Sequence, residues 1–315
     1  MKTLEFSNGD KMPAIGLGTW KSAPGEVGKA VLDAIKAGYR HIDCAAIYQN
    51  EAEIGEALKE AFDSGLVSRS DLWITSKLWN DSHRKDQVPA AMEKTLKDLK
   101  LDYLDLYLMH WPVALKNGVL QPKSADDFLS LDEVPVEETW NAMEALVDKG
   151  QARHIGVSNF SENKLRKLTG CCRMRPEMNQ VELHPYLQQR GLLDFCRNTG
   201  LFMTGYSPLG SKDRSNRKDD EPDLFELPEL KEVAKKHDCT VAQVMIAWQV
   251  NRGTAVIPKS TNAERIQQNL EAGNIDLDND DMEKIAKLDK GYRFIDGTFW
   301  EKEGNSYTVE SLWND

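Results

Sequence analysis

The sequence predicts a (β/α)8 barrel, in which eight parallel strands form a closed ring inside a layer of helices. One indication is a recurring unit of a short apolar strand followed by an amphipathic helix, a pattern typical of parallel strands joined by right-handed crossovers. Another is that eight such units can be counted, which favours a closed barrel over an open doubly wound sheet. A third is that no linker rich in Pro, Gly or Ser divides the 315 residues. We therefore expect residues 1–315 to form a single domain.

The expected strands are short, apolar and bounded by polar or turn-forming residues. They are Ile15–Thr19, His41–Ala45, Leu72–Leu78, Leu104–His110, His154–Ser158, Glu177–Leu183, Phe202–Ser207 and Thr254–Ile257. Helix patterns with one apolar face lie between them. Two examples are Glu26–Ala37, which stops at Gly38, and Glu51–Phe62.

Three segments depart from the simple repeat. Leu4–Met12 carries Asn-Gly between apolar flanks, which predicts a β-hairpin that closes the barrel floor. Long segments follow the fourth strand (Trp111–Pro135) and end the chain (Gly291–Asp315). Loops of this length in a compact domain are usually functional or disordered, and we expect them to lie over the C-terminal face of the barrel.

Composition and charge disfavour several classes of partner. The net charge of −11 argues against nucleic acid and against non-specific adhesion to membranes. The five cysteines include no C-x-x-C pair, which argues against a disulfide framework and a zinc site and favours a reducing compartment. The N-terminus has no apolar signal region, and no apolar run approaches the length of a membrane span. We expect a cytoplasmic protein.

Four polar residues stand at or just beyond the ends of the second, third and fourth expected strands: Asp43, Tyr48, Lys77 and His110. A parallel barrel gathers such positions at its C-terminal face, where active sites of this fold lie. The phenol of Tyr48 has an ordinary pKa of about 10, and a neighbouring ammonium such as Lys77 is expected to lower it. Taken singly, the tyrosine could be a packing residue and the lysine a solvated one. The joint placement favours a proton-donating enzyme site.

Several longer motifs then resemble the aldo-keto reductase family along essentially the whole chain. They are residues 38–48 (GYRHIDCAAIY), 104–112 (LDLYLMHWP), 155–160 (IGVSNF) and 257–260 (IPKS). The resemblance implies reduction of an aldehyde or ketone by NADPH, with hydride transfer from nicotinamide C4. It also implies that Tyr48 is the acid, that Lys77 and Asp43 tune it, and that His110 orients the carbonyl.

The resemblance further implies a row of NADP(H) contacts along the barrel mouth. These are Thr19, Trp20, Asp43, Ser158, Asn159, Gln180, Tyr206, Ser207, Leu209, Ser211, Lys259, Ser260, Arg265, Gln268 and Asn269. Tyr206 would stack on the nicotinamide ring. Two alternatives are open, because Asn159 could be a helix N-cap and Tyr206 could simply fill the barrel.

The adenine end of this row can also be argued from physical chemistry. Thr261 and Glu264 fit a capping box, so a helix is expected to begin just after Ser260. A helix N-terminus favours phosphate, and Lys259 and Arg265 add positive charge. This combination favours NADP(H), which carries a 2′-phosphate, over NAD(H). The alternative is that the two cations belong to a solvated helix face.

An apolar substrate pocket is expected at the same mouth. The expected substrate contacts are Trp20, Tyr48, Trp79, His110, Trp111 and Trp300. Further aromatic residues of the last segment are expected over the mouth, or as anchors of the segment: Phe294, Phe299, Tyr307 and Trp313. His184 has no second ligand at metal spacing, so no metal is expected.

Two other functions compete with a broad aldehyde reductase that acts as a monomer on small carbonyl compounds. A cofactor-binding regulatory or structural protein would be favoured by loss of a catalytic position, but all four positions are intact. A dedicated sugar-phosphate or polyol enzyme would need extra cations at the mouth. Candidates for such cations are Lys116, Lys123 and Lys302.

Overall fold

A ring of eight parallel strands forms the centre of the protein in the computed structural model, which describes residues 2–212, 214, 217 and 220–314. In sequence order the strands are β3 (Leu17–Gly18), β4 (His41–Asp43), β5 (Trp73–Leu78), β6 (Leu104–Met109), β9 (Ala152–Ser158), β10 (Met178–Glu182), β11 (Phe202–Tyr206) and β12 (Ala255–Val256). Each strand pairs with the next in parallel. These strands coincide with the eight expected runs, so the predicted fold class is confirmed.

The first and last strands close the ring. Ile15 forms a parallel bridge with Val256, and Gly18 forms one with Lys259. Because the seam consists of single bridges, β3 and β12 are shorter than the predicted strands. A Cβ atom at Gly18 would lie 2.7 Å from the carbonyl oxygen of Ile257. Glycine at this position therefore permits the close approach of the two backbones.

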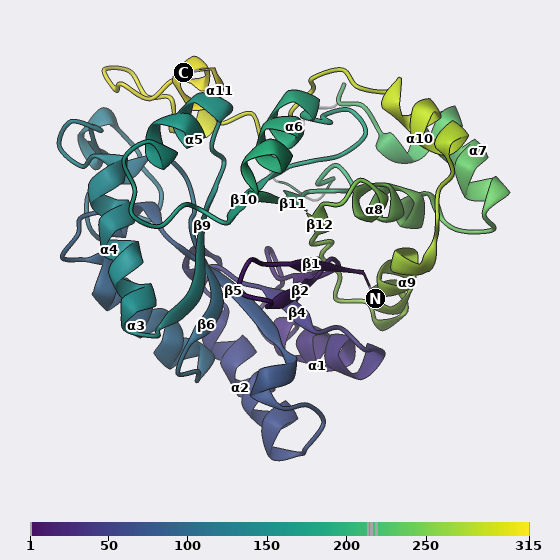
Figure 1. Cartoon of the computed structure of the whole chain (residues 1–315), viewed down its shortest axis with the longest axis horizontal. Coiled ribbons are helices and arrows are strands. Elements are labelled where there is room, and N and C mark those ends of the chain that lie inside the picture. Colours follow the sequence, from purple (N-terminus) through teal and green to yellow (C-terminus); the bar gives the residue numbers. More distant parts are fainter. Residues whose placement is uncertain (1, 213, 215–216, 218–219, 315) are drawn as a thin grey trace.

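The predicted N-terminal hairpin lies across the floor of the barrel (Figure 1). It consists of β1 (Thr3–Glu5) and β2 (Lys11–Pro13), joined by a turn in which Gly9 has φ 89°. Its apolar residues pack against the starts of the barrel strands in one buried cluster, whose members are Leu4, Phe6, Met12, Trp73, Leu106, Leu108, Met178 and Ala255. The hairpin removes the apolar lower end of the barrel from water.

Helices surround the ring and bury their apolar faces against it (Figure 1). They are α1 (Val27–Ala37), α2 (Glu51–Asp63), α3 (Val88–Leu99), α4 (Val136–Asp148), α5 (Glu162–Thr169), α6 (Arg190–Thr199), α7 (Pro228–Lys236), α8 (Val241–Asn251), α9 (Ala263–Glu271) and α10 (Asn279–Ala286). The helix α1 ends as expected at Gly38, which has φ 107° and donates its N–H to the carbonyls of Ala34 and Ile35. Short 3-10 turns are η1 (Ala46–Tyr48), η2 (Arg69–Asp71), η3 (Asn80–Ser82), η4 (Ala125–Asp127), η5 (Leu224–Glu226), η6 (Ala272–Asn274) and η7 (Thr298–Trp300).

The two long segments pack against each other. The segment after β6 forms a small antiparallel pair, β7 (Ala114–Leu115) with β8 (Phe128–Leu129). The C-terminal segment, described as far as residue 314, ends in helix α11 (Val309–Trp313). The hydroxyl of Tyr307 donates to the carbonyl of Leu129 at 2.8 Å and accepts from the N–H of Ala114 at 3.1 Å. Tyr307 thereby joins the two segments.

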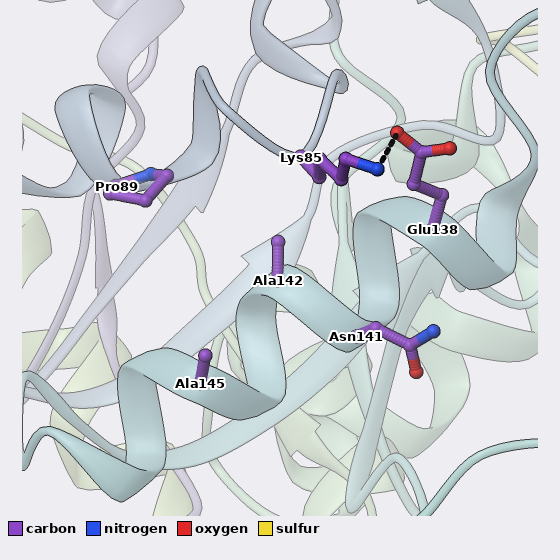
Figure 2. A pocket seen from close by; sticks show the side chains of 6 residues that line it. All are labelled: Lys85, Pro89, Glu138, Asn141, Ala142 and Ala145. Atoms are coloured by element: carbon purple, nitrogen blue, oxygen red, sulfur yellow. Dashed lines mark ion pairs between the residues drawn. The ribbon is translucent and has the colours of Figure 1, made fainter.

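A surface pocket of about 530 Å³ lies between α3 and α4, where Lys85 pairs with Glu138 at 3.9 Å (Figure 2). None of the expected site residues lines it. Among the described helices, none is both long enough and apolar enough to cross a membrane.

Candidate active site

Lys77 and Asp43 form a buried ion pair at the C-terminal ends of two adjacent strands. Lys77, on β5, is 0% exposed, and its Nζ lies 2.5 Å from Oδ1 of Asp43 on β4. The same ammonium donates to the carbonyl of Cys44 at 2.8 Å. Burial acts to lower the pKa of Lys77, but Asp43 and the neighbouring Tyr48 outweigh it, so that the pKa is raised. Lys77 is therefore a permanent positive charge inside the barrel.

Tyr48 stands beside this charge on turn η1, directly after β4. The Nζ of Lys77 lies 5.3 Å from the centroid of the Tyr48 ring, and the tyrosine is only partly exposed. Lys77 acts to lower the pKa of Tyr48, as expected. Burial acts in the opposite direction and is stronger, so the pKa of Tyr48 is raised. The expectation of a lowered value is wrong, because the sequence showed the ammonium but not the desolvation of the phenol.

His110 completes the group from the end of β6. Its ring centroid lies 5.9 Å from that of Tyr48, with the ring planes 77° apart, and 5.1 Å from that of Trp79. Burial, with a smaller contribution from the charge of Lys77, holds the pKa of His110 well below its usual value. The imidazole is therefore neutral near pH 7. A neutral ring can donate one hydrogen bond without adding charge.

A chain of side-chain hydrogen bonds links this group to three residues expected to bind the cofactor. The Nε2 of Gln180, on β10, donates to Oδ2 of Asp43 at 2.7 Å. The hydroxyl of Ser158, at the end of β9, donates to the carbonyl of Gln180 at 2.7 Å. The amide of Asn159 donates to Oγ of Ser158 at 3.2 Å. Four strands thus contribute to one continuous polar network.

Asn159 and Tyr206 extend this network across the mouth. The hydroxyl of Tyr206 donates to Oδ1 of Asn159 at 2.7 Å, and the amide of Asn159 donates to the carbonyl of His110 at 3.0 Å. Asn159 has φ 64°. The N-cap of α5 is Ser161, which accepts from the N–H of Lys164, so Asn159 is not the helix cap.

Thr19 and Trp20 follow β3 on the other side of the group. The hydroxyl of Thr19 donates to the carbonyl of Asp43 at 2.8 Å, and the amide of Asn50 donates to the carbonyl of Thr19 at 2.9 Å. Trp20 is partly exposed, and the Nζ of Lys21 lies 4.6 Å from its ring centroid. Among the described rings, Trp20 stacks on none of the other tryptophans.

The segment after β11 is a tight loop at the edge of the mouth. Ser207 and Ser211 have φ 49° and 44°, and their hydroxyls lie 2.6 Å apart. Leu209 between them packs against the edge of the core. The loop thus brings two hydroxyl groups together, and hydroxyl groups can donate hydrogen bonds to an anionic group.

The predicted adenine end has its helix one residue later than expected. The N-cap of α9 is Asn262, which accepts from the N–H of Arg265 at 2.9 Å, so the Thr261–Glu264 capping box is wrong. Asn is as good a cap as Thr, and the hydroxyl of Ser260 accepts from the N–H of Asn262. Gln268 donates to Glu264 at 3.3 Å, and Asn269 is buried.

Lys259 and Arg265 flank this helix start, and neither has an ion pair within the described part of the chain. Lys259 also forms the seam bridge with Gly18. Two cations without carboxylate partners beside a helix N-terminus fit a phosphate monoester. The residues present therefore fit NADP(H), whose 2′-phosphate distinguishes it from NAD(H).

An aromatic group lies over the other side of the mouth. The ring of Trp300 lies 5.9 Å from that of Trp79 and 5.7 Å from that of Trp111, and Trp300 is 1% exposed. Phe299 and Trp313 contact Trp111 at 5.5 and 5.8 Å. The C-terminal segment therefore covers the mouth, as expected.

Phe294 does not join this group. It packs instead in a separate cluster with Tyr186, Leu224 and Trp248, because the segment enters the mouth from the side of β10 and β11. Of the lysines considered for a sugar-phosphate site, Lys116 and Lys123 are exposed. The Nζ of Lys302 donates to the carbonyl of Phe299 at 3.1 Å.

Sequence reasoning missed two buried carboxylates close to the site. Glu51 accepts hydrogen bonds from Ser76 (2.5 Å) and Thr95 (3.1 Å), and burial raises its pKa to about 7. Glu182 contacts the C-terminal segment. Period-two alternation from Gln180 could have indicated that Glu182 faces the barrel interior. No cluster of three or more metal-binding side chains occurs within the described residues.

Known proteins are similar to this chain along most of its length. Residues 14–290 match the Aldo/keto reductase family. Aldo/keto reductase slr0942 of Synechocystis sp. is 51% identical, over 100% of this chain and 97% of its own. Aldo-keto reductase family 1 member A1 of Gallus gallus is 48% identical, over 91% of this chain and 89% of its own.

Solved structures give the same result. The aldose reductase of Schistosoma japonicum superposes with a TM-score of 0.87 at 40% identity, covering 98% of this chain and 100% of its own. A Bombyx mori aldo-keto reductase in complex with NADP gives 0.85 at 37% identity, covering 95% and 96%. The chain therefore belongs to the aldo/keto reductase family and is an NADP-dependent oxidoreductase that acts on carbonyl groups.

Proposed function

We propose that this protein reduces aldehydes, together with some ketones and aldoses, to alcohols with NADPH, and that Tyr48 donates the proton. The observation that carries the proposal is the buried Lys77–Asp43 pair beside the Tyr48 ring. The raised pKa of Tyr48 keeps the phenol protonated at neutral pH, as a proton donor requires. The ammonium of Lys77 then stabilises the phenolate that forms when the proton leaves.

The other residues of the site position the carbonyl. Bound NADPH supplies the hydride that reaches the carbonyl carbon. The neutral ring of His110 donates a hydrogen bond to the carbonyl oxygen, and Tyr48 protonates the same oxygen as negative charge develops there. Asp43 holds Lys77 charged and in place, and Gln180 holds the second oxygen of Asp43.

The cofactor site follows the row of residues around the mouth. Ser158, Asn159 and Gln180 supply polar groups at the nicotinamide end, where Tyr206 supplies a ring. Ser207, Leu209 and Ser211 would cover the pyrophosphate. Lys259, Ser260 and Arg265 would hold the 2′-phosphate, and Gln268 and Asn269 would contact the adenine.

Binding of the 2′-phosphate can be tested by changing both cations. In a Lys259→Met/Arg265→Met variant, the Kd for NADPH should rise about 10²- to 10⁴-fold, because two charge-assisted contacts of about 1.5–3 kcal/mol each are lost. The Kd for NADH should change little. Protein fluorescence titrations with both cofactors would measure this ratio, and an equal weakening of both would contradict the assignment.

We place the substrate beside His110, next to the aromatic group of Trp79, Trp111 and Trp300. Apolar rings next to two hydrogen-bond donors, Tyr48 and His110, suit aldehydes with apolar substituents. The Schistosoma japonicum relative is an aldose reductase, which supports including aldoses among the substrates. We further propose that residues 1–315 act as one domain, as a monomer. Five free cysteines support a reducing cytoplasmic location.

The first test follows NADPH absorbance with an aromatic aldehyde in wild type and Tyr48→Phe. We expect turnover in the wild type and a loss of about 10²–10⁴-fold in kcat in the variant, with the Kd for NADPH retained. Tyr103→Phe is the matched control, since its ring stacks on Arg69 at the barrel floor. A kcat in Tyr48→Phe close to that of the wild type would disprove the proton donor.

A further inference from the structure

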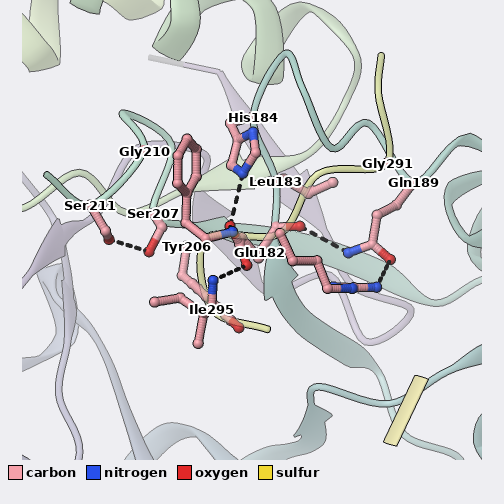
Figure 3. Close-up of polar contacts among 12 residues, drawn as sticks. Glu182, Leu183, His184, Gln189, Tyr206, Ser207, Gly210, Ser211, Gly291 and Ile295 are labelled. Carbon is pink, nitrogen blue, oxygen red and sulfur yellow. Dashed lines mark hydrogen bonds and ion pairs between the residues drawn. The ribbon is translucent and has the colours of Figure 1, made fainter. Parts of the chain in front are cut away.

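Glu182 is a fully buried carboxylate at the end of β10, and its oxygens hold the backbone of the C-terminal segment. Oε1 accepts from the N–H of Phe294 at 2.7 Å, and Oε2 accepts from the N–H of Ile295 at 3.0 Å. The Nε2 of His184 lies 2.8 Å from Oε1, and both side chains are 0% exposed (Figure 3). Since a carboxylate can only accept, Nε2 of His184 carries the proton.

The side chain of Phe294 holds the same part of the C-terminal segment by packing. Its ring lies 4.8 Å from the ring of His184, and the guanidinium of Arg214 lies 5.2 Å from its centroid. A Cβ atom built on Gly210, in the loop after β11, would lie 3.1 Å from the Phe294 ring. The segment is therefore wedged between the end of β10 and the loop that contains Ser207 and Ser211.

Glu182 also lies close to Tyr206, whose ring we propose to contact the nicotinamide. It pairs in register with Tyr206 on β11, and it follows Gln180 by two residues, so both side chains point to the same face of the strand. The pKa of Tyr206 is raised well above its usual value, mainly by burial and further by the charge of Glu182. The carboxylate thus adjoins both the ring of Tyr206 and the C-terminal segment.

The neighbouring part of the segment is held by further polar contacts. Arg293 donates to Oε1 of Gln189 at 3.4 Å, and Gln189 donates to the carbonyl of Glu182 at 2.8 Å. The guanidinium of Arg293 lies 3.8 Å from the centroid of Trp313, whose Nε1 donates to the carbonyl of Asp296 at 2.7 Å. Trp300 follows a few residues later and is the centre of the aromatic group.

We infer that Glu182 is a positioning residue. It fixes the position of the aromatic group of Trp79, Trp111 and Trp300 relative to the ring of Tyr206, and this position determines how well large apolar aldehydes bind. The inference rests on the proposed function. The N–H groups of Phe294 and Ile295 can both bond Glu182 only when the C-terminal segment lies at one height above the mouth. This height fixes Trp300 relative to the four polar residues expected to be catalytic. Small aldehydes that do not reach Trp300 gain nothing from this arrangement.

The test compares Glu182→Gln with wild type, using 2-naphthaldehyde and propanal as substrates. An amide nitrogen cannot accept a hydrogen bond, so one backbone N–H of the segment loses its partner. We expect the KM for 2-naphthaldehyde to rise about tenfold, the change given by one lost contact in a binding pocket. The kcat with that substrate, the KM for propanal and the Kd for NADPH should stay within about threefold.

Glu53→Gln is the matched control, because Glu53 likewise accepts from two backbone N–H groups, but those of Gly25 and Gly28, which follow β3 and are not part of the C-terminal segment. Amide hydrogen exchange gives a readout that does not depend on turnover. We expect the amides of Phe294 and Ile295 to exchange faster in Glu182→Gln and at the wild-type rate in Glu53→Gln. Unchanged exchange at both amides would overturn the inference.

The kinetics can overturn it as well. Equal losses with the small and the large aldehyde, or weaker NADPH binding, would show a general structural role instead. If Glu182→Gln does not fold, His184→Leu leaves both backbone contacts and should raise the KM for 2-naphthaldehyde alone, by a smaller factor. A loss with both aldehydes in that variant would also overturn the inference. If the wild type turns over neither 2-naphthaldehyde nor propanal, the result would instead refute the proposed function itself.

Discussion

The two ends of the barrel each contain a buried histidine, and the two rings have different neighbours. On the floor, His154 stands between two carboxylates, with Nδ1 2.8 Å from Glu177 and Nε2 3.0 Å from Asp10. At the mouth, His110 lies near the ammonium of Lys77. Burial acts to lower the pKa of both rings, but at His154 the two carboxylates outweigh it and the pKa is raised. At His110 the pKa is well below its usual value.

The difference shows what each end is built for. His154 joins the hairpin, through Asp10, to the barrel, and its ring lies 4.3 Å from that of Phe6 and 5.3 Å from that of Trp73. Its raised pKa favours the charged form, and both ring nitrogens already have carboxylate partners within the protein. At the mouth, the neutral His110 and the charge of Lys77 lie beside Tyr48, and in the proposed reaction negative charge would develop there.

The largest loss of stability is expected when the Lys77–Asp43 ion pair at the mouth is broken. In Lys77→Met the carboxylate of Asp43 stays buried without its cation, and the free energy of unfolding should fall by about 3–5 kcal/mol. Urea denaturation would measure this loss, together with the loss of reductase activity. Lys2→Met is the control, since its pair with Asp276 is exposed and worth at most about 1 kcal/mol. Equal losses in the two variants would contradict the contrast between buried and exposed pairs.

A smaller effect, on stability alone, is expected at the floor. His154→Gln should lower the free energy of unfolding by about 1.5–3 kcal/mol, since bonds between charged groups are lost, and should leave kcat unchanged. Because the folded pKa of His154 is raised from 6.5, the wild-type advantage should be full below about pH 6.5 and should decline as pH rises through the folded pKa. Denaturation of both proteins over a pH series would measure it.

Arg153→Gln provides the control for the floor. The Arg153 side chain is itself half exposed, and the buried Asp105, 3.6 Å from it, keeps a closer pair with Arg69 at 2.7 Å. The loss of Arg153 should therefore cost only about 1 kcal/mol. An advantage of wild type over His154→Gln that grows toward alkaline pH would contradict the raised pKa of His154.

The smallest expected effect is a difference in pKa between the rings of His154 and His110. By NMR, His154 should titrate above pH 6.5, whereas His110 should stay neutral well below it. Because the pKa of His110 is lowered, its contribution to the free energy of unfolding is full above pH 6.5 and is lost as pH falls from 6.5 through the folded pKa. This pH dependence is opposite in sign to that of His154. Titration of His110 at or above pH 6.5 would contradict the neutral ring assigned to the mouth.

The strand pattern could be predicted from local sequence, whereas the charge states could not. The eight apolar runs, the Asn-Gly hairpin and the stop at Gly38 all depend on residues near each other in the chain, and all three predictions are confirmed. The lowered pKa expected for Tyr48 is wrong, because its burial depends on segments far away in sequence. The Thr261–Glu264 cap failed for a local reason, since Asn262 competes for the same role.

The sequence by itself determined the fold class, the family and the placement of Asp43, Tyr48, Lys77 and His110 at strand ends, because strand periodicity and motif spacing are local properties of the chain. Only the tertiary structure decided which neighbours each buried group meets. It joined Gln180 to Asp43, separated Phe294 from the other aromatics of the tail, and attached the tail to Glu182. Desolvation and pairing depend on every segment packed around a group, and those segments are distant in the chain.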